Sequence, residues 1–211
     1  MIHRPSPRRQ VEFSSWPPDA QDDAIAGLLE LAEDSAHDVA AHMRRTARLA
    51  QAFVQELGLG EPLARVVVLT ARLHDIGKLG IPPWVLEKEG PLSEFELRLM
   101  RGHSLIGQEM LERRPELMAI GPLVRATHER WDGTGYPDGL RGPAIPLPSR
   151  IVSVCDAFDA MTRPRSYSES MPIQGALDEL EAGAGTQFDP GATTVFRGLI
   201  ESRFARAAKE A

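Results

Sequence analysis

The residues best suited to chemistry stand in the stretch ARLHDIGKLGI, where His74, Asp75 and Lys78 interrupt an otherwise apolar helix ending. Burying ionisable side chains is costly unless they are paired or bind a metal. The two oxygens of Asp75 could bridge two metal ions, and paired metals suit the hydrolysis of phosphate esters. From these residues alone the alternative stays open that Asp75 caps a helix end or pairs with Arg72 at the surface.

Other histidines and aspartates fall on different predicted helices. Helical bundles build metal sites by converging about one ligand per helix on the core. Imidazole and carboxylate ligands together suit iron, manganese or zinc better than calcium. A thiolate zinc finger is excluded because Cys155 is the only cysteine. The candidate series is His42, the pair His74 and Asp75, His103, His128 and Asp156.

Helical periodicity dominates the elements that must position these side chains. Apolar stripes predict helices near residues 23–34, 39–58 and 61–77, and the spacing of Ser93 and Glu96 predicts a capping box that starts a helix running to Arg113. Further helices are predicted at about 116–130 and 149–161 and after Pro172 and Pro190. Because alternating strand patterns are nearly absent, we expect an all-α bundle.

One loop departs from this helical pattern. Residues 131–146 hold four glycines and three prolines, so this segment cannot be helical and must turn several times. The loop directly follows His128, so its backbone NH groups and Tyr136 could border a metal pocket. The plainer alternative is that it only connects two helices.

Length and composition predict one domain. With 211 residues and 42% hydrophobic residues, the chain can form one sizeable core. We expect residues 1–21 to be a mobile arm or linker and residues 22–211 to be the helical domain. A net charge of −6 argues against binding to nucleic-acid polymers, and no segment has a signal-peptide or membrane-spanning pattern. A cytoplasmic location without membrane contact is the expectation.

Several motifs resemble those of a known family. His74 and Asp75, followed by IGK and GIP, resemble the signature of the HD superfamily of metal-dependent phosphohydrolases. HERWDGTGYP, residues 128–137, resembles the motif of its HD-GYP subgroup. SRIVSVCDAFDAMTRPRSY is similar to the segment that delivers the last metal aspartate, and GTQFDP is similar to the C-terminal signature. The resemblance spans roughly residues 35–200 in the family's order.

The resemblance implies an HD-domain helical bundle with a GYP loop, and a phosphodiesterase that hydrolyses cyclic di-GMP to pGpG, to GMP or to both. It implies two divalent metal ions, iron or manganese first, with zinc, nickel, cobalt or magnesium as alternatives. Asp75 and Lys78 would be catalytic, and Lys78, Tyr136, Arg165 and Tyr167 would contact substrate. The implied metal ligands are His42, His74, Asp75, His103, His128 and Asp156, with Asp38 as a further candidate.

Three positions depart from the HD-GYP pattern. Thr127 stands where most members have a second histidine, and Asp38 stands where members with three metals have a glutamate. Ser168 replaces the usual lysine or arginine after the RxY pattern. We therefore expect two metals, and Ser168 removes one candidate phosphate contact.

These departures leave rival functions open. One is an HD-type phosphohydrolase that acts on another nucleotide or phosphate ester. Another is a module that binds cyclic di-GMP or a protein without turnover, and a di-iron oxygenase is a remoter third. The sequence also leaves open a sensor, receiver or GGDEF-type protein partner, and a homodimer.

Overall fold

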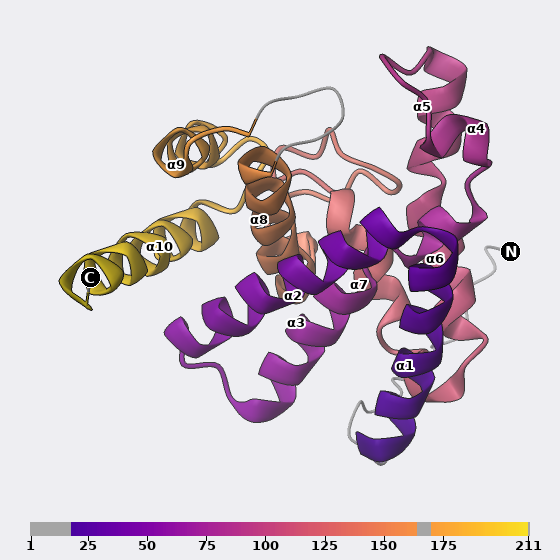
Figure 1. Ribbon diagram of the computed structural model, residues 1–211, viewed down its shortest axis with the longest axis horizontal. Helices are drawn as coiled ribbons and strands as arrows, with labels where there is room; N and C mark the ends of the chain where they lie inside the picture. The colour runs from indigo at the N-terminus through magenta and orange to yellow at the C-terminus, as the bar shows by residue number, and fades with distance from the viewer. Residues whose placement is uncertain (1–17, 164–169, 211) are drawn as a thin grey trace, which may run out of the picture.

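The computed structural model describes residues 18–163 and 170–210 of the chain, and this part is helical (Figure 1). The only pairing of strand type within it is an isolated bridge between Ala184 and Phe188. The expectation of an all-α fold is therefore confirmed. Helix α1 (Pro18–Ser35) begins before residue 22, the predicted start of the helical domain, since proline suits the first turn of a helix.

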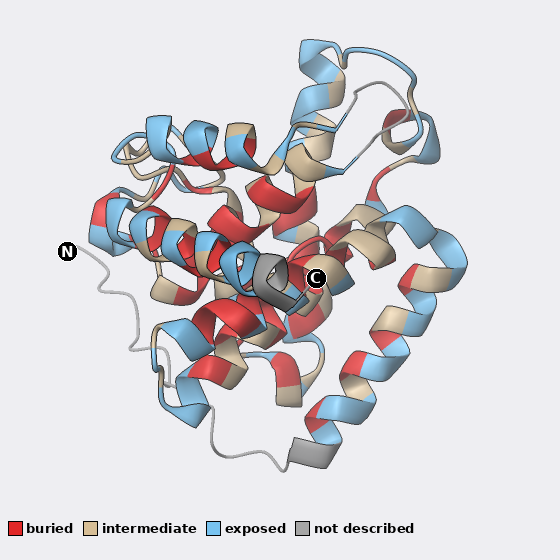
Figure 2. Cartoon of the chain, turned by 60° about the vertical axis from the view of Figure 1, so that its left-hand side comes forward, coloured by how far each residue is buried: buried red, intermediate tan, exposed pale blue. Residues whose placement is uncertain are grey.

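Two apolar cores share the helices α2 (His37–Glu56) and α3 (Glu61–Leu73). The first core joins them to α8 (Leu147–Thr162), α9 (Ile173–Ala182) and α10 (Pro190–Glu210), around Phe53 and Phe196. The second joins them to α1, α6 (His103–Glu112) and α7 (Gly121–Arg125), around Met43 and Leu73. Figure 2 shows the buried residues gathered inside these layers. Residues near the middle of α2 and the end of α3 therefore lie where the two cores meet.

A close backbone approach fixes the segment that follows α3. The 3-10 helix η2 (Ile76–Gly80) contacts α6 at Gly77, where an added Cβ would lie 1.9 Å from the carbonyl oxygen of His103. Gly107 of α6 faces the same contact, because its own Cβ would lie 3.4 Å from the Gly77 nitrogen. Only glycine permits this distance at residue 77. The contact brings Asp75, at the start of η2, next to His103.

The capping box predicted at Ser93 and Glu96 is confirmed at the start of α5 (Glu94–Arg101). The Ser93 backbone NH donates to Glu96 at 2.6 Å, and the Glu96 NH donates to the Ser93 hydroxyl at 3.3 Å. Together with α4 (Pro83–Leu86), α5 projects from one end of the molecule (Figure 1).

Three predicted helices are wrong in their continuity. The helix predicted near residues 61–77 ends at Leu73, and η2 follows it as a separate 3-10 helix. The helix from Ser93 to Arg113 is divided at Gly102, whose NH is shared between the carbonyls of Arg98 and Leu99, so that α5 ends and α6 begins. The helix at 116–130 is three short ones: η3 (Pro115–Leu117), α7 and η4 (Ala126–His128). Pro122 lacks a backbone NH and restricts the residue before it, so a helix can start there but cannot continue through it.

No helix in the described ranges combines the length and the apolar character needed to cross a bilayer.

Candidate metal centre

Asp75 lies at the middle of the site, and each of its oxygens faces a different pair of histidines. Oδ2 is 3.5 Å from His74 Nε2 and 3.8 Å from His42 Nε2. Oδ1 is 3.3 Å from His103 Nε2 and 3.9 Å from His128 Nε2. The side chain is 1% exposed, so both oxygens are directed into the protein rather than toward water.

Six predicted ligands form two adjacent triads of metal-binding type. Within each triad the ligand atoms lie within 4.8 Å of one another. Asp156 completes the first triad, since its Oδ1 is 2.8 Å from His42 Nε2 and 3.7 Å from His74 Nε2. The triads are His42, His74 and Asp156, and Asp75, His103 and His128.

Two buried atoms at this centre lack hydrogen-bond partners among the described residues: His74 Nε2 and Asp75 Oδ1. Buried polar atoms without partners are rare and costly. Both are atoms of the kind that bind divalent transition metals, and their residues belong to the two triads. The residues present therefore fit divalent metal ions held by the two triads.

The backbone orients two of the histidines. His74 Nδ1 lies 2.9 Å from the carbonyl oxygen of Ala71, and His103 Nδ1 lies 2.7 Å from that of Met100. A carbonyl oxygen can only accept a hydrogen bond, so Nδ1 of each ring carries the proton. Nε2 therefore keeps its lone pair, which faces the centre. Since each carbonyl is three residues back at the end of a helix, the helix ends themselves set these imidazole rings.

His42 is oriented by side chains instead. Its Nδ1 is 2.8 Å from Asp159 Oδ2, and Arg45 donates Nε to both oxygens of Asp159 at 2.9 and 3.1 Å. Asp159 is 4% exposed, so it is a buried partner of the predicted ligand His42 and not a surface carboxylate. Arg45 could not be identified from the sequence because Asp159 lies 114 residues away.

Burial and charge oppose each other at these groups. Burial lowers the pKa of His42, but its contacts with Asp156 and Asp159 outweigh burial and raise that pKa to about 9. Burial likewise opposes ionisation of Asp75, yet Lys78, His74 and His103 hold its pKa below the usual range. For His128, burial and the neighbouring His103 lower the pKa to about 3.

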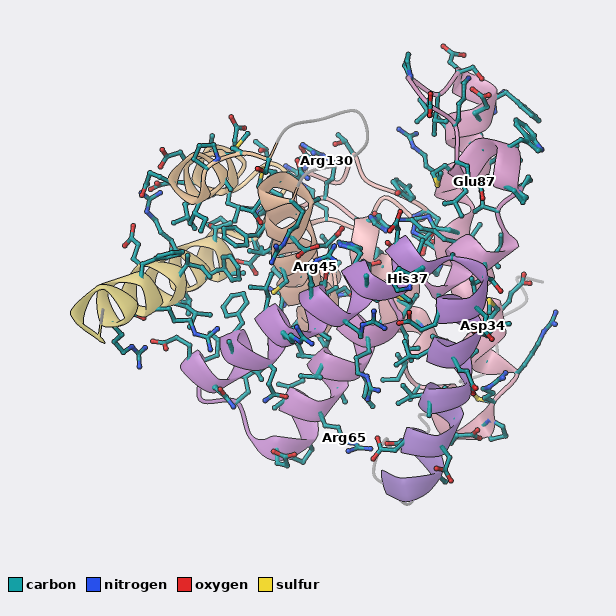
Figure 3. All side chains as sticks on the ribbon, in the orientation of Figure 1. Asp34, His37, Arg45, Arg65, Glu87 and Arg130 are labelled. Atoms are coloured by element: carbon teal, nitrogen blue, oxygen red, sulfur yellow. The ribbon has the colours of Figure 1, made fainter. Side chains whose placement is uncertain are left out.

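Lys78 follows one turn after His74 and donates its Nζ to Asp75 Oδ2 at 2.5 Å. Its side chain is 24% exposed and lines a pocket of about 850 Å³ that also reaches Asp75, His42 and Asp159. Figure 3 labels three lining residues, His37 and Arg45 on α2 and Glu87 after α4. An anionic substrate in this pocket would meet the Lys78 ammonium at the metal centre.

Asp38 lines the same pocket one helical turn before His42, but it is exposed and belongs to neither triad. Thr127 is buried, and its hydroxyl donates to the Val124 carbonyl at 2.8 Å. Neither residue is brought into the group of six ligands. Arg165, Tyr167 and Ser168 lie outside the described residues.

The glycine- and proline-rich loop is built around Glu129. This side chain is 4% exposed. Its carboxylate accepts hydrogen bonds from the backbone NH groups of Asp138 at 2.7 Å and Leu140 at 3.0 Å. Gly135 lies so close to the Glu129 and Arg130 backbone that a Cβ would be 2.3 Å from the Arg130 nitrogen. The sequence interpretation missed Glu129, although a glutamate beside a loop rich in backbone NH groups was the available signal.

This loop places Tyr136 against the second triad. The Tyr136 ring stacks on His128 with centroids 5.2 Å apart and planes 9° apart. Burial, Asp75 and Asp156 raise the pKa of the Tyr136 hydroxyl, which therefore stays protonated and able to donate. The structure thus places Tyr136 beside His128, one of the predicted ligands.

The C-terminal GTQFDP segment supports the loop. Trp131 NH donates to the Gln187 carbonyl at 3.1 Å, and Asp132 NH donates to that of Thr186 at 2.8 Å. Arg150 of α8 donates to Asp189 at 2.5 Å. Motifs separated by some fifty residues therefore hold one another in place.

Comparisons with known proteins agree with this geometry. The family model described as HD domain matches residues 28–192. The cyclic di-GMP phosphodiesterase response regulator RpfG of Xanthomonas campestris is 43% identical over 71% of this chain and 40% of its own. A cyclic di-GMP phosphodiesterase of Thermotoga maritima is 38% identical over 74% of this chain and 43% of its own. A 3'3'-cGAMP-specific phosphodiesterase of Vibrio cholerae is 35% identical over 79% of this chain and 32% of its own. The chain thus spans less than half the length of these relatives.

Solved structures show the same fold. The protein Bd1817 of Bdellovibrio bacteriovorus, described as an HDG"Y"P protein, aligns with a TM-score of 0.63 at 20% identity over 85% of this chain and 62% of its own. The HD domain of the Listeria monocytogenes phosphodiesterase PgpH, in complex with cyclic-di-AMP, aligns with a TM-score of 0.61 at 20% identity over 84% and 95%. With the HD pair at the centre of two ligand triads and the GYP triplet stacked on the second, this chain belongs to the HD domain family, in its HD-GYP group.

Proposed function

We propose that the chain is a metal-dependent phosphodiesterase that hydrolyses cyclic di-GMP to pGpG, GMP or both. One observation carries this proposal: the two oxygens of Asp75 face separate triads, 3.3 Å from His103 and 3.5 Å from His74. Two neighbouring cation sites that share a carboxylate suit an in-line displacement at phosphorus. The names of the relatives point to the same substrate class.

Two divalent ions, iron or manganese by preference, would be held by His42, His74, Asp156, Asp75, His103 and His128. When bound, such a pair supplies Lewis-acid neutralisation of the phosphodiester and activation of water. Asp38 stands one turn from His42 at the pocket rim, so it remains a candidate for a further ligand only if its side chain turns inward.

The chain's own side chains bind and orient the substrate. The Lys78 ammonium stabilises negative charge on the phosphate oxygens, and its contact with Asp75 holds it at the centre. The protonated Tyr136 hydroxyl donates a hydrogen bond from the His128 side. Arg165 and Tyr167 also contact the substrate in this proposal.

A second candidate substrate is 3'3'-cGAMP, which differs from cyclic di-GMP in one base. It is favoured by the 35% identity to phosphodiesterases that are named as specific for it. We place the protein in bacterial second-messenger signalling in the cytoplasm. Its partner would be a sensor, receiver or GGDEF-type domain, consistent with the greater length of the relatives, and a homodimer is the alternative assembly.

The test is turnover by the protein reconstituted anaerobically with iron(II) or manganese(II). Cyclic di-GMP, 3'3'-cGAMP and an unrelated phosphodiester are incubated separately, and the products are separated by chromatography. Formation of pGpG or GMP supports the proposal, whereas preference for 3'3'-cGAMP supports the second candidate. Binding of a cyclic dinucleotide without any product would overturn the enzyme assignment in favour of a binding module.

A further inference from the structure

Arg101, the last residue of α5, lies beside the metal centre. Its guanidinium carbon is 5.3 Å from the centroid of the Tyr136 ring, and that ring stacks on His128. Two successive contacts therefore connect an exposed cation to the triad of Asp75, His103 and His128. None of the sequence motifs draws attention to this arginine.

Two other cations at the centre, Lys78 and Arg45, already have carboxylate partners. Lys78 donates to Asp75 at 2.5 Å, and Arg45 donates to Asp159 at 2.9 Å. In the described part of the chain Arg101 has no carboxylate within 4 Å of its guanidinium. The guanidinium instead makes a cation–π contact with the Tyr136 ring. Stacking on an aromatic face orients the planar guanidinium while its NH donors stay available to an anion.

The centre has two flanks that differ in shape. The 850 Å³ pocket opens on the side lined by Arg45, Lys78 and Asp159. Arg101 and Tyr136 do not line that pocket and border the His128 side instead. A cyclic dinucleotide carries two phosphodiesters, so one nucleotide in the pocket leaves the rest of the ring to extend along the second flank.

We propose that Arg101 binds a phosphate oxygen of the cyclic dinucleotide on the Tyr136 flank of the centre. This inference rests on the proposed function. The Arg101 guanidinium contacts the Tyr136 ring, which stacks on His128, and makes no contact with Asp75 or the first triad. Arg101 would therefore help to bind the substrate in its ground state and would not act on the reacting phosphate. Its loss should therefore raise KM more than it lowers kcat.

Arg98 provides a matched control. It lies one turn earlier on the same helix, is also exposed, and has its guanidinium 5.9 Å from the centroid of an aromatic ring. That ring belongs to Phe95, which is 56% exposed and contacts none of the ligands. Arg98→Ala therefore removes the same charge and the same kind of contact from α5 without touching the Tyr136 flank.

The experiment compares wild type, Arg101→Ala, Arg101→Lys and Arg98→Ala as manganese-loaded proteins in cyclic di-GMP turnover at low and high salt. Losing a charge-assisted hydrogen bond should raise KM by about tenfold or more in Arg101→Ala, with kcat within about twofold of wild type. Arg101→Lys should recover part of the loss, Arg98→Ala should match wild type, and added salt should narrow the difference in KM.

Equal KM values for Arg101→Ala and Arg98→Ala would overturn the inference while leaving the proposed function intact. So would a fall in kcat at unchanged KM, or equal damage by the alanine and lysine variants, because both indicate a structural role. A wild-type protein that turns over no cyclic dinucleotide would instead overturn the proposed function. Wild-type turnover is measured first, so this outcome is separated from the comparison of the variants.

Discussion

Asp75 shows how much chemistry one residue can concentrate. Its side chain is buried, its two oxygens face two triads, and Lys78 is its only lysine partner among the described residues. The six candidate ligands and Lys78 could be singled out because ionisable residue types at apolar helical positions are conspicuous and because the motifs resemble those of the HD superfamily. Arg45 and Asp159, which orient His42, could not be paired from the sequence because their contact forms only when the fold brings α2 against α8.

Asp159→Asn should weaken metal binding by about 10- to 100-fold, the usual effect of losing a partner that orients a ligand. If the amide NH2 of the new asparagine faces His42 Nδ1, it donates a hydrogen bond, so Nδ1 must act as the acceptor. The imidazole proton then moves to Nε2, the atom that would bind the metal. If the amide oxygen faces His42, the NH2 group instead opposes the Arg45 guanidinium.

Competition with a chelator measures this affinity. Asp178→Asn is the control, since Asp178 is an exposed carboxylate that contacts Arg197 far from the ligands. An Asp159→Asn protein that binds metal as tightly as the control would show that the contact with His42 contributes nothing.

At the scale of elements, the site depends on how helices end. His74 and His103 are oriented by carbonyls in the last turns of α3 and α5, and Asp75 is placed by the contact of η2 with α6. Periodicity predicted the helices, but it missed the ends at Gly102 and Pro122. These ends depend on single glycine and proline residues, whose local effect outweighs the apolar pattern around them.

Gly77→Ala tests the packing of η2 on α6. A Cβ 1.9 Å from the His103 carbonyl cannot be accommodated without moving backbone, so we expect a loss of about 2–3 kcal/mol in the free energy of unfolding. Gly198→Ala, at an exposed position of α10 with nothing within 4 Å of the added Cβ, should stabilise the protein by about 0.5–1 kcal/mol. Urea unfolding measures the free energy of unfolding of both variants. Equal free energies of unfolding for the two would contradict this packing.

The capping box of α5 makes a prediction about pH. The contact with Lys88, followed by the hydrogen bonds with Ser93, lowers the pKa of Glu96 from 4.5 to about 2. Because the folded pKa is depressed, the stabilisation is complete above about pH 4.5 and is lost as the pH falls toward 2. Amide exchange at Leu97, corrected for the intrinsic rate, should therefore show less protection at pH 3 than at pH 5.

The same acid-dependent loss should be absent in Glu96→Gln, which keeps a hydrogen-bond acceptor but has no charge to lose. Glu94→Gln, in the same first turn, should behave as wild type. An equal change in protection for wild type and Glu96→Gln would refute the assignment to this carboxylate.

At the scale of the whole molecule, the centre lies where two apolar cores meet. Helices α2 and α3 belong to both cores, and the ligands from α6, η4 and α8 reach them from either side. The all-α class and the convergence of ligands could be predicted from spacing and motif order. The division into two cores and the support of the GYP loop by residues 186–189 could not, because both depend on contacts between distant segments.

The most direct test of the account is the metal content of wild type and Asp75→Ala after the same anaerobic reconstitution, with turnover measured on the same samples. Wild type should hold about two ions per chain. Asp75→Ala should lose both metal loading and cyclic di-GMP hydrolysis while keeping its helical circular dichroism, and Asp34→Ala, an exposed carboxylate on α1, should match wild type. An Asp75→Ala protein that keeps two ions or its turnover would contradict the central role of this carboxylate.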